Sequence, residues 1–147
     1  MQRLLLCSLL ALGLAACGGD KSTGPSDADI GGSWRITFTN MSGFGVSCNS
    51  NAFPLQITQS GSTFTGSYGL GTFTCTGPGG STSVDVEGVV VNGTVDINAV
   101  AFDLDTQDAH QTGSVSGNSM SGTAWWRLDL GGGQIITFNG NWSAVKQ

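Results

Sequence analysis

The segment 117–145 reads GNSMSGTAWWRLDLGGGQIITFNGNWSAV, and its pattern decides the fold. Within it, apolar or small residues occupy every second position over 120–128 and again over 136–144. Side chains of a β-strand point alternately to the two faces of a sheet, so a period of two predicts two strands with one buried face each. The glycine triplet 131–133 between them is a turn signal. The segment therefore predicts a β-hairpin.

The same pattern extends back to Gly32. Hairpin signals such as Ser60-Gly61 and Asn92-Gly93 separate the alternating runs. No segment after residue 18 has the period of a helix longer than one or two turns. We therefore expect an all-β fold, a single antiparallel meander of about eight to ten strands. The other alternating runs begin at Trp34, Phe53, Phe64, Val84 and Val100.

The pattern leaves two architectures open. Eight antiparallel strands can close into a barrel and so remove the exposed edges of the sheet. Two stacked sheets also bury one face of each strand, so a β-sandwich is the alternative. Glycines within the runs would let a sheet bend far enough to close, which favours the barrel. These glycines are Gly66, Gly88, Gly122 and Gly140.

The composition excludes several classes of protein. Of the 147 residues, 24 are Gly and only five are Lys or Arg, with a formal net charge of −5. A nucleic-acid binder needs a basic surface, which this chain lacks. Helical bundles are rich in Ala, Glu, Lys and Leu, and disordered chains are poor in apolar residues, whereas 39% of this chain is hydrophobic.

The N-terminus predicts export and lipidation. Residues 1–16 combine one positive charge, a short apolar core and small residues, which is the pattern of a signal peptide. The four residues Leu14-Ala15-Ala16-Cys17 resemble the bacterial lipobox, L-[AS]-[AG]-C. The resemblance implies a lipoprotein, cleaved before Cys17 and anchored to a bilayer by acyl chains such as palmitate on that residue. An ordinary secretory signal cleaved near Ala16 is the alternative.

Residues 17–30 follow as the lipidated cysteine and a flexible linker, because they are rich in Gly, Ser, Pro and Asp. Residues 31–147 would then form one β-barrel domain. Gly18 directly after the cysteine suggests the outer membrane, by the sorting rule of enteric bacteria. The expected location is the bacterial cell envelope, on its periplasmic or surface face.

Two further cysteines predict a disulfide. Cys48 and Cys75 are an even pair in an exported chain, and the envelope is oxidising. The bond would close a loop worth about 3 kcal/mol of stability. A zinc site is the alternative, but the only histidine, His110, cannot complete a tetrahedral shell with two cysteines unless carboxylates join. We expect no metal.

Gly32-Ser33-Trp34 at the start of the first run resembles the G-x-W motif of the calycin group, which contains the lipocalins and avidins. The resemblance implies a closed eight-stranded barrel in which this tryptophan closes one end. It also implies that the ring packs against a basic side chain near the end of the last strand, where Lys146 lies, with Arg127 one hairpin earlier. The lipocalin T-D-x-x-Y pattern and C-terminal helix are absent, so no ligand is implied.

The aromatic residues at the alternate strand positions that are expected to face inward are the candidate ligand-binding residues. They would line an apolar cavity in the barrel, or alternatively fill it as an ordinary core. Trp125 falls on the outward parity and is a candidate contact with a partner. The inward set is Trp34, Phe38, Phe64, Tyr68, Phe102, Trp126, Phe138 and Trp142.

No catalytic pattern accompanies them. The segment 113–117 places Val115 where a G-x-S-x-G hydrolase has its serine. The carboxylates of Asp96, Asp103, Asp105 and Asp108 lack the Gly and Glu of a calcium loop, so we interpret them as a solvated outer face. His110 is expected in a loop. We therefore expect neither enzymatic activity nor a cofactor.

The predicted function is a membrane-anchored lipoprotein whose barrel binds a small apolar or amphipathic ligand. The alternative is a non-enzymatic envelope protein, structural, interacting or inhibitory, with a filled barrel. Its contacts with a protein partner would then lie in loops such as 41–52 and 76–83.

Overall fold

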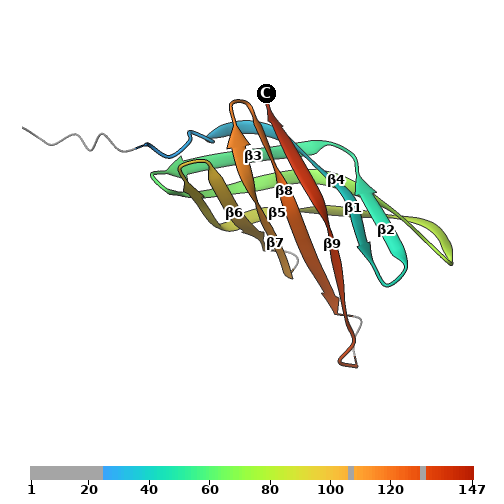
Figure 1. Ribbon diagram of the computed structural model, residues 1–147. Helices are drawn as coiled ribbons and strands as arrows, with labels where there is room; N and C mark the ends of the chain where they lie inside the picture. Colours follow the sequence, from blue (N-terminus) through green and yellow to red (C-terminus); the bar gives the residue numbers. More distant parts are fainter. Residues whose placement is uncertain (1–24, 106–107, 130–131) are drawn as a thin grey trace, which may run out of the picture.

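The computed structural model describes residues 25–105, 108–129 and 132–147, which form nine β-strands and no helix (Figure 1). No part of these residues is a helix able to cross a bilayer. The predicted signal peptide and lipidated Cys17 lie outside the described residues. The strands are β1 (Gly32–Gly43), β2 (Val46–Ser50), β3 (Phe53–Ser60), β4 (Thr63–Gly77), β5 (Gly80–Asp96), β6 (Ala99–Leu104), β7 (Asp108–Ser116), β8 (Ser119–Asp129) and β9 (Ile135–Lys146).

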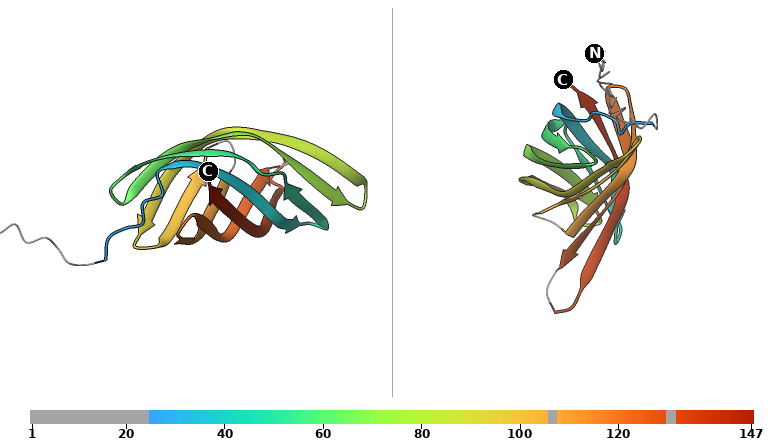
Figure 2. Two further views of the ribbon diagram at one scale, coloured as in Figure 1. Left: turned by 90° about the horizontal axis from the view of Figure 1, so that it is seen from above. Right: turned by 90° about the vertical axis from the view of Figure 1, so that its left-hand side faces the viewer.

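These strands form one antiparallel sheet that closes on itself. From β3 to β9 each strand pairs with the next, β3 also pairs with β1, and β9 pairs back with β1. Seen from above, β4 and β5 curve over β7, β8 and β9 (Figure 2). The result is a barrel-like ring of eight strands, which confirms the predicted meander. The sandwich alternative is excluded, because all nine strands of the described chain belong to a single sheet.

The nine strands make a ring of eight, because β2 and β3 together take the place of a single strand. Both strands lie between β1 and β4 and run antiparallel to both. β3 pairs with residues 32–36 of β1, and β2 pairs with residues 41–43 further along the same strand. The two strands are thus segments of one interrupted strand, broken at residues 51–52. The predicted loops 41–52 and 76–83 are wrong: the first is mostly the β1–β2 hairpin, and the second is the tip of the β4–β5 hairpin.

A β-bulge in β1 changes which of its residues point inward. Trp34 and Phe38 are buried as their parity predicts, but Met41, of the opposite parity, is also fully buried. Asn40 has a φ of 54°, and residues 40 and 41 together face the single residue Gly140 of β9. An extra residue in one strand shifts the alternation by one. A Cβ on Gly140 would lie 2.7 Å from Met41 Cα, so this position requires glycine.

Aromatic side chains fill the interior of the ring. Trp126 packs against Phe73 and Phe38, with ring centroids 4.4 and 5.2 Å away. Further along the axis, Phe102 packs edge-on against Trp142 at 5.2 Å. A void of only about 10 Å³ remains between the first group and its neighbours. The middle of the ring is therefore a packed core, not a continuous cavity.

The two ends of the ring differ. The entry end, where the chain enters the ring, carries the turns at 60–63, 96–99 and 116–119. Ile30 is fully buried there, and its carbonyl accepts a 2.8 Å hydrogen bond from Trp34 Nε1. Asp27 Oδ1 accepts a 2.8 Å bond from the backbone N–H of Ile97. The packed part of the chain thus begins near Asp27, within the segment expected to be linker, and closes this end.

Candidate functional site

A cavity lies at the opposite end of the ring, which we name the pocket end and which carries the turns at 43–46 and 77–80. Its volume is about 140 Å³, and its lining is almost entirely apolar. β1, β2, β4, β5, β8 and β9 all contribute side chains to it. The lining residues are Met41, Cys48, Phe73, Cys75, Val84, Val86, Trp126, Arg127, Leu128 and Phe138.

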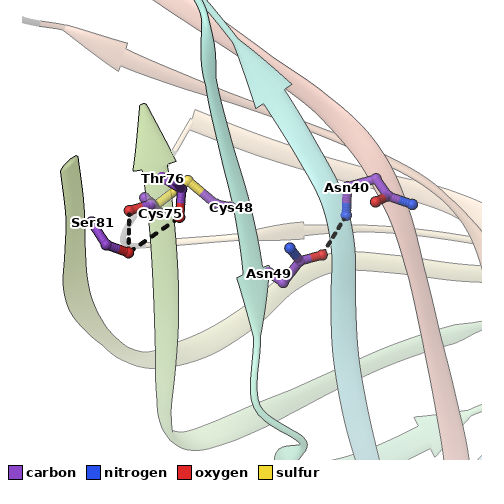
Figure 3. Close-up of a disulfide and its surroundings, with 6 residues drawn as sticks. All are labelled: Asn40, Cys48, Asn49, Cys75, Thr76 and Ser81. Atoms are coloured by element: carbon purple, nitrogen blue, oxygen red, sulfur yellow. Dashed lines mark hydrogen bonds between the residues drawn. A yellow bond between two sulfur atoms is a disulfide. The ribbon is translucent and has the colours of Figure 1, made fainter. Parts of the chain in front are cut away.

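One wall of the cavity is the predicted disulfide. Cys48 and Cys75 are directly opposite each other in the β2–β4 pair and form a bond with an S–S distance of 2.05 Å (Figure 3). Polar contacts hold the strands on both sides. Asn49 Oδ1 accepts a 2.8 Å hydrogen bond from the backbone N–H of Asn40, and Ser81 Oγ donates to the Cys75 carbonyl at 3.3 Å. The bond therefore fixes β2 against β4 where β2 joins the ring.

The inner wall is aromatic. Trp126 and Phe73 lie at the boundary between the cavity and the packed core, since both also line the small void behind it. Trp126 Nε1 is buried, and no group in the described residues accepts a hydrogen bond from it. Gln111, fully buried deeper in the ring, likewise has an amide without a partner in this part of the chain. Two polar groups are thus left unpaired in an otherwise apolar interior.

The rim of the cavity exposes apolar side chains. Val84 and Leu128 line the cavity and are each 49% exposed. Beyond them, Phe44 in the β1–β2 turn and Ile135 at the start of β9 are even more exposed, and both line a second hollow of about 440 Å³. An apolar mouth of this kind typically marks a binding surface.

Arg127 is the one charged residue that lines the cavity, but its guanidinium group lies on the outer face of the ring. Its guanidinium carbon lies 4.7 Å from the ring centroid of Trp125, on the outer face, in a cation–π contact. Its Nη1 also lies 3.4 Å from a carboxylate oxygen of Asp108. Trp125, the candidate partner contact, is therefore covered in part by Arg127.

His110 lies on the outer face, in β7, and not in a loop as expected. It pairs with Asp103 of β6 and Trp125 of β8 in the ladder, because β7 starts directly after the short connection that follows β6. His110 Nδ1 and Asp103 Oδ1 are 2.6 Å apart. Neither residue lines a cavity described for this chain. In the described residues, no three His, Cys, Asp or Glu side chains form a group that could hold a metal ion.

The eight aromatic residues predicted to bind a ligand fall into three groups. Trp126 and Phe138 line the cavity. Phe38 and Tyr68 line only the small void. The remaining four belong to the packed core and line neither the cavity nor the small void; they are Trp34, Phe64, Phe102 and Trp142. The structure thus brings two of the eight to one site.

Several lining residues were not singled out from the sequence. Val84, Val86 and Leu128 occupy the alternate positions of their strands that were predicted to face inward, so the sequence pattern could have identified them. Met41 could not have been identified in this way, because the bulge at Asn40 turns its side chain inward where the alternation predicts that it faces outward.

The residues behind the calycin resemblance lie at the entry end. Trp34 pairs with Lys146, whose Nζ lies 5.5 Å from the centroid of the indole ring. This is the contact that the G-x-W motif implied, made by a lysine at the end of the last strand. Membership of that group is not established by one such contact. No protein-family model matches this chain, and no curated protein matches its sequence.

Proposed function

We propose that this protein is a membrane-anchored, non-enzymatic binding protein that takes up a small apolar or amphipathic ligand at its pocket end. The observation that supports this function is the apolar cavity of about 140 Å³ walled by the Cys48–Cys75 bond and by Trp126. An apolar cavity of about 150 Å³ in another protein binds benzene. The buried part of the ligand is therefore about the size of a benzene ring.

The surroundings of the cavity favour an amphipathic ligand. The packed core behind Trp126 and Phe73 stops a long chain from entering the ring. Apolar burial would supply the affinity, at about 25 cal/mol for each Å² removed from water. Any charged part of the ligand would stay at the rim, between Leu128 and the outer face where Arg127 and Asp108 lie.

Anchoring through Cys17 fits this arrangement. Nine residues lie between Cys17 and Asp27, where the packed part begins, and the ten Cα-to-Cα steps span at most about 35 Å when extended. The tether joins the ring at the entry end, so the pocket end would face away from the lipid surface. We place the protein in the bacterial cell envelope, at the outer membrane.

The binding proposal is tested with fluorobenzene, a probe of the right size. All strands of the described chain lie within residues 25–147, so the chain from Gly18 onward, with its disulfide formed, is the unit to study. We expect the ¹⁹F signal of fluorobenzene to broaden and shift in a saturable way. Val86→Phe should abolish this effect, because residue 86 lines the cavity.

Val89→Phe is the matched control. Val89 lies on the same strand, is 41% exposed and does not line this cavity, so the same substitution there should leave binding intact. If the folded protein does not bind fluorobenzene, or if the two variants behave alike, the binding function is refuted.

The second candidate is an envelope protein that binds another protein with the same end. The exposed side chains of Phe44 and Ile135 favour it, because solvent-exposed aromatic and aliphatic groups often mark a contact surface. Failure of fluorobenzene binding, together with envelope partners that are cross-linked to the wild type and lost with Phe44→Ser, would support this function instead.

A further inference from the structure

The three turns at the pocket end contain no charged residue. The β1–β2 turn 43–46 reads Gly-Phe-Gly-Val, the β4–β5 turn 77–80 reads Gly-Pro-Gly-Gly, and the described part of the β8–β9 connection, 132–134, reads Gly-Gly-Gln. Turns usually carry polar residues, because they lie at the surface in water. The entry end follows this rule, with Asp96 and Asn98 in its turn at 96–99. The pocket end is therefore the less polar end of the ring.

Exposed apolar side chains gather at the same end. Phe44 is 85% exposed and Ile135 is 62% exposed, and both line one hollow. Val84 and Leu128, each about half exposed, line the cavity. We call these four residues the apolar rim. A group of exposed apolar side chains of this kind marks a contact with another molecule or with a membrane.

The hairpins that carry the apolar rim lie against one another, so its side chains belong to one surface. A Cβ added at Gly43 would clash with the Thr137 carbonyl, which places the β1–β2 hairpin beside the start of β9. A Cβ added at Gly77 would lie 3.0 Å from Val46 Cγ2, which places the same hairpin beside the end of β4. Figure 1 shows the β1–β2, β4–β5 and β8–β9 hairpins reaching outward on this side of the ring.

The low charge of this surface favours an uncharged occupant. The charged residues next to the rim in the sequence are Asp85, Arg127 and Asp129. Asp85 accepts a 2.7 Å hydrogen bond from Thr72 Oγ1, and Arg127 lies over Trp125 on the outer face. A folded protein partner usually surrounds its apolar contact with polar groups that need matching polar groups. The hydrocarbon of a lipid bilayer needs no such match, so it fits the charge-free turns better.

We propose that the apolar rim docks onto the surface of a lipid bilayer, with Phe44 inserted among the lipid chains and the mouth of the cavity facing the membrane. The insertion is shallow, because the backbone groups of the turns must stay hydrated. This contact goes beyond the proposed binding function, since it needs the rim and not the cavity. It would give an apolar ligand, which partitions into lipid, a direct route to the cavity.

The proposed lipid anchor leaves the apolar rim free for this contact. Cys17 would hold the chain at the entry end, so the rim would face away from the bilayer that carries the anchor. The bilayer that the rim meets is therefore a second one, opposite the first. The chain from Gly18 onward lacks the anchor, so its binding to vesicles reports the rim alone.

The test measures flotation of the chain from Gly18 onward with vesicles of phosphatidylcholine, a lipid without net charge. We expect the folded protein to float with the vesicles equally at low salt and in about 1 M NaCl, where charges are screened beyond about 3 Å. Phe44→Ser should weaken binding by about ten-fold, because a large apolar side chain no longer leaves water. The fold should survive this substitution, since Phe44 is exposed.

Ile97→Ser is the matched control. Ile97 lies in a turn at the entry end, is 47% exposed and has a φ of 56°, close to the 52° of Phe44. The same substitution there should leave vesicle binding unchanged. A second comparison locates the contact. The tryptophan of Phe44→Trp should be quenched by vesicles whose acyl chains carry bromine, and that of Ile97→Trp should not.

The outcomes separate docking from ligand binding. The docking proposal is overturned if the folded wild type does not float, if high salt removes the binding, or if Phe44→Ser and Ile97→Ser weaken it equally. Without flotation, envelope proteins that are cross-linked to the wild type and lost with Phe44→Ser would point to a protein partner instead. Val86→Phe should lose fluorobenzene but still float, and a loss of flotation there would assign the contact to the cavity and overturn the role of the rim. If the wild type floats without binding fluorobenzene, the docking stands and the proposed binding function fails.

Discussion

The disulfide between Cys48 and Cys75 allows a quantitative prediction about the stability of the ring. It closes a loop of 27 residues. The chain-entropy relation for a loop of this length gives a loss of about 12 cal/mol/K in the unfolded chain, or about 3.5 kcal/mol at 25 °C. We therefore expect reduction of the bond to lower the free energy of unfolding by about 3.5 kcal/mol.

The estimate assumes that reduction leaves the folded ring unchanged. This is reasonable because β2 keeps its ladder with β4 on both sides of the bond, from Ser47↔Thr76 to Ser50↔Phe73. The hydrogen bond from the Asn40 backbone to Asn49 also remains. The stabilisation then arises in the unfolded state, which the bond makes less disordered.

The assay is urea unfolding of the chain from Gly18 onward, followed by tryptophan fluorescence with and without a reducing agent. For a domain of this size we take a slope of about 1.5 kcal/mol per M urea, so the midpoint should fall by about 2 M. The double variant Cys48→Ala/Cys75→Ala should unfold close to the reduced protein. A midpoint that falls by less than about 0.5 M with an unchanged slope would refute the reasoning.

Three further substitutions test the packing described above. Gly140→Ala should destabilise by about 1–3 kcal/mol, because its Cβ would meet the bulged backbone at Met41. Gly79→Ala, with open space around the added Cβ, should be nearly neutral, and equal effects of the two would contradict the bulge. Ile30→Ala should lower the free energy of unfolding by about 2–4 kcal/mol, because the Ile30 side chain is fully buried. As a control, Ile135→Ala should change the free energy of unfolding by less than about 0.5 kcal/mol, because Ile135 is exposed. If Ile30→Ala has an equally small effect, the entry end is not closed as described. Gln111→Leu should be neutral or stabilising, because it removes a buried amide that no described group satisfies. A clear loss of stability in its urea curve would show that the amide has a partner.

The strands were predictable from the sequence because alternation depends on local chemistry. Buried side chains such as Phe53, Leu55 and Ile57 follow one parity without interruption, so the pattern predicts their strand directly. Closure of the ring was not predictable in this way. It depends on the pairing of Trp34 with Lys146, and a sandwich would show the same alternation in both strands.

The site was less predictable than the fold. Parity identifies Trp126 and Phe138 as inward residues but does not distinguish a lined cavity from a filled core, because the free volume depends on how all strands stagger. The bulge at Asn40 has no clear signal in the sequence, so Met41 could not be assigned to the lining. Ile30 was assigned to the linker because its neighbours are polar, although its side chain is fully buried at the entry end and its carbonyl accepts a hydrogen bond from Trp34.

The pairing of the first strand with the last has a consequence for how the chain folds. Among the strands of the described chain β1 is synthesised first and its partner β9 last, so the ring cannot close until β9 has been made. Until then β1 and β8 each have an edge with unpaired backbone groups, which other chains can join. Contacts between distant parts of a chain also form slowly. We therefore expect slow refolding, losses to aggregation that grow with protein concentration, and a strong dependence of the folded yield on an intact β9.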